Sequence, residues 1–301
     1  MSLAIGLRFY RLTIRRKGDN KPLPVGPGST PCDLYEYVGS FVKRRTDPTE
    51  ETAEPRTWYF EKKAANSIRA VHGYLHYGTH GFESKLKDAK TKKPKYERQS
   101  SDLEEIPLYF QIWSPSDAEY GIMAFQSFGG RSCVTFVRTA MMKDFVKAYP
   151  GYTLSFKTLV PAQSVIEEAP VKTITFVKPK RSSDRAERML GRPVDEVDYQ
   201  LIVKAKRRGG MLATFKDLRS LLKEDKNGFV EFDGREFEGV TADVKMGRKR
   251  RTVGLFGSGI DAGLIDVSEN VSRDKSGHPK FSSITDEVDD LMEEMYGNLK
   301  T

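Results

Sequence analysis

The chain has 301 residues and carries 50 lysines and arginines against 42 aspartates and glutamates, which gives a formal net charge of +8 and a pI near 9.2. Hydrophobic residues make up 38% of the sequence and aromatic residues 11%, which argues against a disordered chain and is typical of one large or two ordinary domains. Cys32 and Cys133 are too few for a disulfide framework, and no apolar run reaches bilayer-spanning length, so we expect a cytoplasmic protein without membrane insertion.

Charge is distributed unevenly along the chain. Residues 171–251 contain 21 lysines and arginines against 13 aspartates and glutamates, whereas residues 252–301 contain 4 against 10. A basic middle followed by an acidic end suggests that the basic part meets a polyanion such as nucleic acid. A basic surface that is only solvated is the alternative interpretation.

The first third of the chain is predicted to be rich in strands. Residues 5–14 alternate well enough for a strand, and residues 57–61 and 64–77 are typical of two more. Residues 32–45 have apolar positions at helical spacing. The segment 64–77 and the residues after it contain three of the four histidines, at positions 72, 76 and 80.

The spacing of these histidines invites comparison with a metal site. Their glycine- and tyrosine-rich surroundings favour a strand, in which residues four apart lie roughly 13 Å from each other. That separation is too large for one zinc ion, which is bound at about 2 Å from each ligand. We therefore expect no metal site, but a strand whose histidines face a polar surface.

Two carboxylate–lysine pairs are the enzymatic alternative. Glu61 with Lys63, and Glu83 with Lys85, match half of the pattern with which metal-dependent nucleases hold a divalent ion and activate water. No aspartate on a preceding hairpin completes the pattern. Glu83 opens a lysine-rich stretch, residues 83–101, for which we expect an exposed loop or hairpin that either reaches phosphates or is only solvated.

Residues 106–160 contain one complete folding unit. The pattern predicts a strand, a second strand at 120–125, a helix that begins near Ser132, and a third strand from Tyr152. Cys133 is expected to pack at the start of the helix rather than to act as a nucleophile. A strand, strand, helix, strand unit gives a sheet with a helix on it, onto which other segments can pack.

The rest of the chain alternates strands, turns and helices. A capping signal at Asp184 predicts one helix, and an apolar stripe predicts a second that ends at Asn227–Gly228. The stripe consists of Leu212, Phe215, Leu218, Leu221 and Leu222. Strands are expected at 171–177, 199–203, 229–232, 236–244, 251–256 and 263–267.

The last helix is predicted over residues 282–299. One face is apolar, and the opposite face is acidic, with residues such as Glu287 and Asp290. Such a helix either packs on its own chain, where it would cover the basic region, or mediates a homo-oligomer.

These elements predict an α+β fold of two mixed sheet-and-helix halves with mostly antiparallel strands. The first half, residues 1–165, is a strand-rich N-terminal domain with the central β-β-α-β unit. The second half, residues 166–301, is a basic α+β domain that ends in the acidic amphipathic helix.

Three basic clusters follow strand ends in the second half. If these strands pair in one sheet, the clusters converge at one rim, where several cations could neutralise phosphates. No recognition helix, zinc finger or aromatic RNA-binding strand is present, so we expect largely sequence-independent binding, of DNA in preference to RNA. The candidate residues are Lys178, Lys180 and Arg181; Lys204, Lys206, Arg207 and Arg208; and Lys245, Arg248, Lys249, Arg250 and Arg251.

The sequence does not indicate a cofactor. No Gly-x-x-x-x-Gly-Lys-Ser/Thr loop exists, and residues 254–263 lack the order of a dinucleotide loop. We therefore expect a non-enzymatic protein, with a metal-dependent nuclease or a protein-interaction subunit as the alternatives.

A glycine-rich histidine pattern within residues 68–81 is followed by Pro107-Leu-Tyr-Phe110, Gly121 to Gln126 and Leu159-Val-Pro161. In this order, over residues 68–210, the chain resembles phage-defence proteins, namely the Rex exclusion proteins of lambdoid phages and the DNA-binding subunits of Kiwa-type systems. The resemblance implies DNA binding in bacterial antiviral defence, by an oligomer. Separately, the basic region could meet a partner defence protein or a phage protein. The resemblance does not assign a role to any individual residue.

Overall fold

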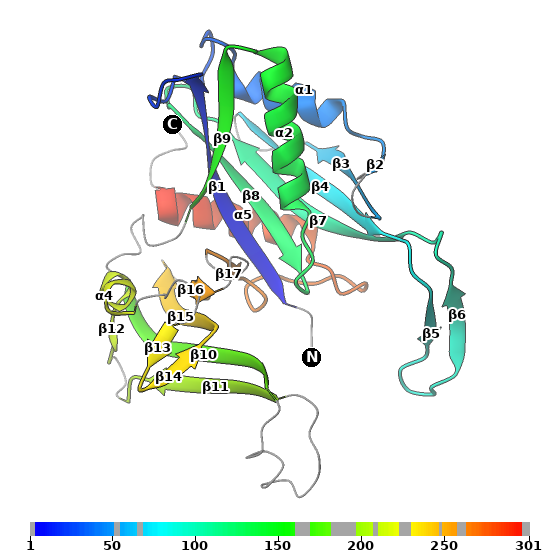
Figure 1. Ribbon diagram of the computed structural model, residues 1–301, viewed down its shortest axis with the longest axis vertical. Helices are drawn as coiled ribbons and strands as arrows, with labels where there is room; N and C mark the ends of the chain where they lie inside the picture. The colour runs from blue at the N-terminus through cyan, green and yellow to red at the C-terminus, as the bar shows by residue number, and fades with distance from the viewer. Residues whose placement is uncertain are drawn as a thin grey trace, which may run out of the picture. The chain divides into compact units, whose positions relative to one another are not determined.

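The computed structural model of the chain describes residues 4–50, 55–64, 69–159, 169–181, 197–206, 210–222, 230–246, 249–257 and 263–296. These residues form four helices and a mostly antiparallel β-sheet structure, so the predicted α+β class is confirmed (Figure 1). In the described part of the chain, no helix is both long and apolar enough to cross a membrane. The chain divides into two compact units: unit 1 has Tyr10–Lys157 and Asp274–Phe281, and unit 2 has Ala4–Phe9, Thr158–Arg273 and Ser282–Thr301.

Unit 1 is built on a sheet whose central strands are continuous apolar runs. Ile112 pairs with both Val71 and Met123, so that the strands around it bury large side chains side by side. In spatial order the strands are β1 (Ile5–Arg16, from Tyr10 onward), β8 (Gly121–Phe128), β7 (Glu104–Trp113), β4 (Ala70–Thr79), β3 (Arg56–Lys63) and β2 (Thr49–Glu50), with β9 (Tyr152–Leu159) beside β1.

Two helices of unit 1, α1 (Leu34–Lys43) and α2 (Val134–Ala148), pack against each other on the sheet. The hydroxyl of Tyr37 in α1 donates to the Met141 carbonyl of α2 at 2.9 Å. Phe41 of α1 meets Phe60 of β3 edge to face, with ring centroids 6.1 Å apart. The predicted unit at 106–160 is confirmed as β7, β8, α2 and β9. Cys133 rather than Ser132 occupies the N-cap position of α2.

The opposite face of this sheet carries the histidines of β4. His76 is half-buried among polar groups, as predicted, but the prediction is wrong for His72, which is 4% exposed. Phe281 packs edge to face on the His72 ring, with centroids 5.2 Å apart, and His72 Nε2 lies 2.7 Å from the Ala64 carbonyl oxygen. The predicted strand 64–77 in fact begins at Ala70.

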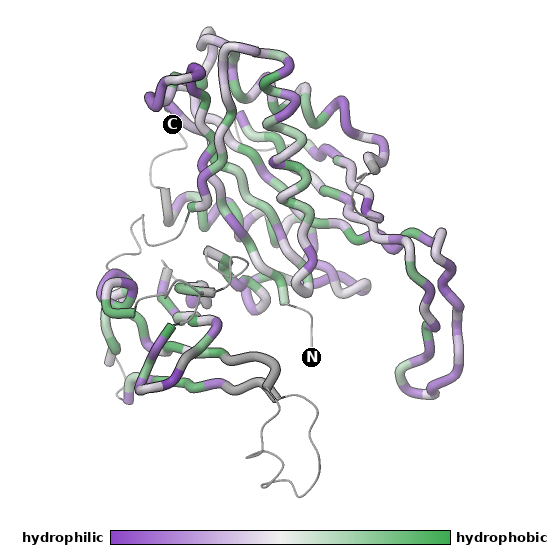
Figure 2. The backbone as a smooth tube through the Cα atoms, viewed as in Figure 1, coloured by the Kyte–Doolittle hydropathy of each residue, from purple (hydrophilic) through white to green (hydrophobic). Residues whose placement is uncertain are grey.

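A hairpin of unit 1 forms a two-stranded sheet of its own. It consists of β5 (Ser84–Lys87) and β6 (Pro94–Arg98), which pair antiparallel and are mostly hydrophilic, in contrast to the apolar β7 and β8 (Figure 2). The exposed hairpin expected within 83–101 is thus confirmed. We call residues 83–98 the arm.

Unit 2 contains an antiparallel sheet whose two faces differ. Phe176 of β10 lies on the buried face, where the rings of Phe232 and Phe237 pack on it at 4.4 and 5.1 Å. In spatial order the strands are β11 (Val197–Lys204), β10 (Pro170–Arg181), β15 (Gly239–Met246), β16 (Lys249–Gly257), β17 (Ile265–Asp266) and the first residues of β1; β12 (Ala213–Thr214) pairs with β10, and β13 (Val230–Phe232) with β14 (Arg235–Phe237).

The helix after β12, α4 (Phe215–Leu221), is shorter than the apolar stripe suggested. Thr214 and Asp217 form a reciprocal capping box, which fixes the start of the helix at Phe215. Leu221, predicted to face inward, is the last residue of the helix and is 73% exposed. The helix ends at Leu221, before an extended Leu222, so the end predicted at Asn227–Gly228 is wrong. The helix predicted after Asp184 lies outside the described residues.

The last helix, α5 (Phe281–Tyr296), confirms the predicted amphipathic helix. Its apolar stripe is fully buried at Ile284, Val288 and Leu291. Among its acidic residues, Glu287 is also buried. A carboxylate at that depth requires cationic or hydrogen-bonding partners.

Candidate nucleic-acid interface

The pairing register of unit 2 determines which of the predicted basic clusters meet. Lys204, at the end of β11, pairs with Thr173 near the start of β10, and Thr173 pairs in turn with Asp243 of β15. Lys245 of β15 pairs with Arg250 of β16. The residues around 204 and those around 245–251 therefore lie at the same end of the sheet.

The third cluster lies elsewhere. Lys178 pairs with Tyr199 and Arg181 with Val197, at the start of β11. Because β10 and β11 are antiparallel, Lys178, Lys180 and Arg181 occupy the end of the strands opposite to Lys204. The predicted residues Arg207, Arg208 and Arg248 lie outside the described residues.

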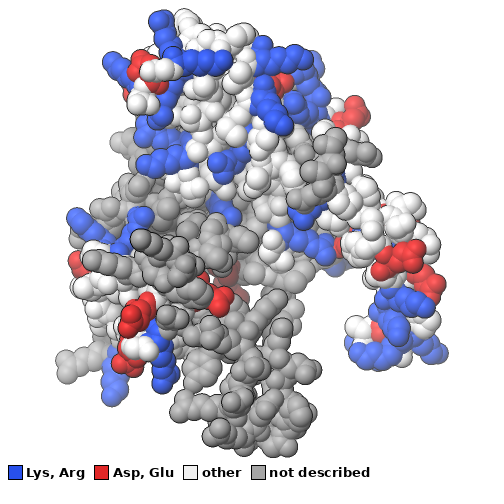
Figure 3. Space-filling view, in the orientation of Figure 1, with Lys and Arg blue, Asp and Glu red and all other residues white. Residues whose placement is uncertain are grey.

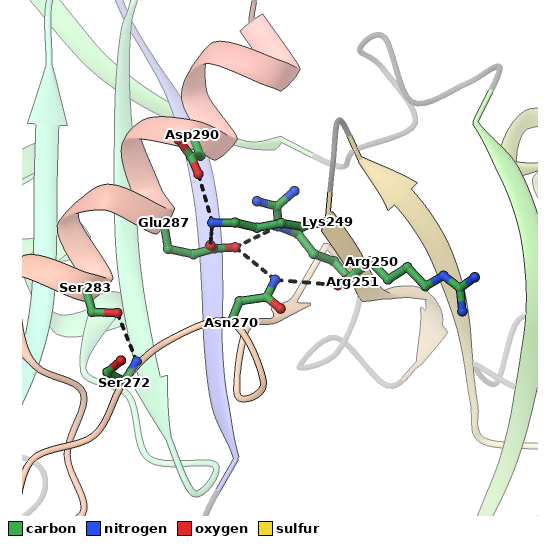
Figure 4. Close-up of polar contacts among 8 residues, drawn as sticks. All are labelled: Lys249, Arg250, Arg251, Asn270, Ser272, Ser283, Glu287 and Asp290. Carbon is green, nitrogen blue, oxygen red and sulfur yellow. Dashed lines mark hydrogen bonds and ion pairs between the residues drawn. The ribbon is translucent and has the colours of Figure 1, made fainter.

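The basic run at the start of β16 is divided between the two faces of the sheet, because side chains alternate along a strand. Lys249 and Arg251 point toward α5, whereas Arg250 points away from it (Figure 4). Arg251 is accordingly 2% exposed, while Arg250 is exposed. Neighbours in the sequence thus have different surroundings.

Glu287 of α5 is the centre of the contacts on the buried side. Its carboxylate accepts hydrogen bonds from Arg251 Nε and Lys249 Nζ, each at 2.7 Å, and from Asn270 Nδ2 at 3.2 Å. Lys249 Nζ also donates to Asp290 at 2.8 Å, and its hydrogen bonds to Asp290 and Glu287 raise the pKa of Lys249 above its ordinary value. In this structure Lys249 and Arg251 therefore bind carboxylates of α5.

The other side of the same strands carries the remaining cations among mostly polar residues, with Ile202 exposed beside Thr175. Lys204, Lys245 and Arg250 are all exposed there, and we call them the basic face. Lys206 is exposed two residues beyond Lys204. Asp243 lies among them and accepts a 2.7 Å hydrogen bond from Thr252. The half-buried residues on this side include Val177 and the polar residues Thr173, Thr175, Thr241, Asp243 and Thr252.

Such a surface is chemically suited to a phosphate backbone. Lysine and arginine neutralise phosphates, and threonine hydroxyl groups donate hydrogen bonds to phosphate oxygens. Neither interaction depends on the base sequence. The basic face therefore fits a ligand that is recognised by its charge.

The first of the two carboxylate–lysine pairs lies on the face of the unit 1 sheet that carries His76. Glu61 forms an ion pair with Lys63, and its second oxygen lies 2.9 Å from His76 Nε2. His76 Nδ1 lies 3.0 Å from Glu105, whose carboxylate also accepts a 3.0 Å hydrogen bond from the Tyr59 hydroxyl. The hydrogen bonds from Lys63 and His76 lower the pKa of Glu61 below its usual range.

The second pair does not form. Lys85 is paired with Glu97 across the arm at 3.0 Å, and Glu83 is exposed ahead of β5. Over the described ranges, no group of three or more histidine, cysteine or acidic side chains is arranged to hold a metal ion.

Comparison with known proteins adds no relative. No protein-family model matches the chain, and no curated protein and no solved structure matches it.

Proposed function

We propose that the protein binds double-stranded DNA in the cytoplasm, largely without regard to sequence, through the basic face of its C-terminal half. The observation that carries this proposal is the register that gathers Lys204, Lys245 and Arg250 on one exposed, threonine-rich side of an antiparallel sheet. A role in bacterial antiviral defence, as an oligomer, rests on the resemblance of residues 68–210 alone, and a partner protein stays an expectation.

Two features support DNA binding over simple solvation of these cations. The basic face retains exposed positive charge although an acidic helix belongs to the same unit, because the carboxylates of Glu287 and Asp290 are engaged by Lys249 and Arg251 on the other side. In addition, the cations belong to β11, β15 and β16 of one sheet, in which β10 lies between β11 and β15, so their backbones are held in a fixed arrangement. Cations on a preordered backbone lose less conformational entropy when they bind a phosphate backbone.

The test is binding of a labelled DNA duplex across a salt series. The variant Lys204→Gln, Lys245→Gln, Arg250→Gln should bind more weakly, with a slope of log affinity against log salt that is smaller by about 2 to 3, because each lost phosphate contact removes about 0.9 from the slope. A matched control, Lys21→Gln, Lys143→Gln, Lys147→Gln, removes three exposed cations from unit 1.

Equal slopes for the two triple variants would contradict a role for the basic face. Absence of binding by the wild type at low salt would reject nucleic acid as the ligand and would favour a protein partner. Magnesium should leave the duplex intact, whereas cleavage would favour the nuclease alternative.

A further inference from the structure

The arm is fixed at its root by one buried cation. Arg98 is 6% exposed, and its guanidinium donates to Glu104 at 2.9 Å, to the Asp102 carbonyl at 3.2 Å and to the Thr79 carbonyl. The Phe82 ring lies 3.9 Å from the same group. An isolated two-stranded hairpin is marginally stable in water. These contacts therefore anchor the base of the hairpin and set the direction in which its two strands extend.

The tip of the arm is also ordered by its own side chains. Asp88 accepts hydrogen bonds from the backbone N–H groups of Thr91 at 2.8 Å and Lys90 at 3.0 Å, and its carboxylate pairs with Lys95 at 2.9 Å. The Thr91 N–H, followed by Lys95, lowers the pKa of Asp88 to about 2. Asp88 is thus a carboxylate at any physiological pH, and the turn is held in one shape.

The arm is strongly basic. Residues 83–98 contain seven lysines and arginines against three acidic residues. Among the described residues, ion pairs engage Lys85, Lys95 and Arg98, while Lys87, Lys90, Lys92 and Lys93 are exposed and have none. Figure 3 shows lysine and arginine side chains gathered over the end of this hairpin.

One side of the arm also exposes apolar surface. Leu86 and Tyr96 pair across the two strands and are 54% and 50% exposed. The Tyr96 hydroxyl donates to Asp102, which holds the ring against the ribbon. A ribbon with free cations at its tip and an apolar pair on its side matches a ligand that has both phosphates and apolar edges.

We propose that the arm inserts into the major groove of double-stranded DNA, as a second contact that rests on the proposed function. The major groove of B-form DNA, about 12 Å wide, admits a two-stranded ribbon whose strands are about 4.8 Å apart. The free lysines reach the phosphates on both sides of the groove, and Leu86 and Tyr96 contact the apolar edges of bases. The deep, narrow major groove of double-stranded RNA excludes such a ribbon.

The experiment compares four proteins on a DNA duplex and on an RNA duplex of the same sequence, each across a salt series. They are the wild type, the arm variant Lys87→Gln, Lys90→Gln, Lys93→Gln, the basic-face variant and the Lys21, Lys143, Lys147 control. The arm variant should bind DNA about tenfold or more weakly at 0.1 M salt, with a slope smaller by about 2 to 3. Its affinity for RNA should equal that of the control.

The outcomes separate the two proposals. If the basic-face variant loses DNA affinity and the arm variant matches the control, the arm proposal is wrong and the basic face stands. If only the arm variant loses affinity, the basic face is wrong and the arm stands. Equal losses on DNA and RNA would overturn groove insertion, and no binding by the wild type would overturn both. Because the substituted lysines and Arg250 are exposed, unchanged circular dichroism is expected for every variant.

Discussion

At the scale of single residues, Arg250 and Arg251 show how one step along a strand changes the role of a cation. Arg250 lies on the exposed basic face, while the Arg251 side chain is buried against Glu287. An alanine substitution of both would combine a surface effect with the loss of a buried ion pair. Experiments on DNA binding should therefore substitute Arg250 alone or with Lys204 and Lys245.

Glu287→Gln is expected to lower the free energy of unfolding by about 3 to 5 kcal/mol, because it removes the buried carboxylate charge to which Arg251 and Lys249 donate. Chemical denaturation monitored by circular dichroism measures the change. Glu293→Gln, an exposed position of the same helix, should stay within about 0.5 kcal/mol of the wild type.

A double variant tests the cause of this loss. Arg251→Met combined with Glu287→Leu removes both charges and should recover most of the stability, since a buried ion pair is often replaceable by apolar groups. If Glu287→Gln alone were as stable as the wild type, the pair would have no structural role.

At the scale of elements, the sequence predicted most helices and strands, because alternation and helical spacing are local properties. It could not predict that Lys249 and Arg251 face α5, because the face of a strand depends on a register set by distant partners. Nor could it predict the burial of His72, which depends on Phe281, a residue more than two hundred positions away. The sequence pattern predicted the acidic face of the last helix, but it did not indicate which side chains bind the acidic residues.

The N-terminus of α1 illustrates an element fixed by one side chain. Asp33 is its N-cap and accepts a 2.9 Å hydrogen bond from the Tyr35 N–H. Arg69 binds both carboxylate oxygens of Asp33, at 2.7 and 2.9 Å. Burial by itself would raise the pKa of Asp33, but the hydrogen bonds from Arg69 and Tyr35 outweigh it, so that the pKa lies below its usual value.

Asp33→Ala should therefore lower the free energy of unfolding by about 2 to 4 kcal/mol, from the lost cap and the lost charged hydrogen bonds. Asp33→Asn keeps the cap and should lose less. Since the folded pKa is depressed, the stabilisation by the charge is present above the unfolded pKa of about 3.9 and is lost as the pH falls through the folded pKa. The difference between wild type and Asp33→Asn should shrink in denaturation experiments over that acid range; a constant difference would contradict this account.

At the scale of the whole molecule, β1 belongs to both compact units. Its first residues pair with β17, through Gly6 with Asp266 and Leu7 with Ile265, and its residues from Tyr10 onward belong to unit 1. The domain boundary at residue 165 stays a prediction. A single boundary along the chain cannot account for a strand that is contributed from the other end of the chain.

A fragment of residues 166–301 lacks Ile5 and Leu7, which are fully buried in the complete chain. Burial of each such side chain stabilises by about 1.5 to 3 kcal/mol, so we expect the fragment to lose cooperative thermal unfolding. The control is the same fragment with residues 1–16 joined to it through a flexible linker, which should restore a cooperative transition. Identical melting curves for the two would show that unit 2 does not need β1.

The pairing of β1 with β17 also has a consequence for synthesis on the ribosome. The Ile5 N–H donates to Ser268 Oγ at 2.8 Å, across 263 positions of sequence. Translation proceeds at roughly 5 to 20 residues per second, so on the order of 10 to 50 s pass between the synthesis of Ile5 and that of Ser268. Translation that stops before α5 yields a chain that has Lys245 and Arg250 but no carboxylate for Arg251, so an unfinished polypeptide is more cationic and less folded than the complete one.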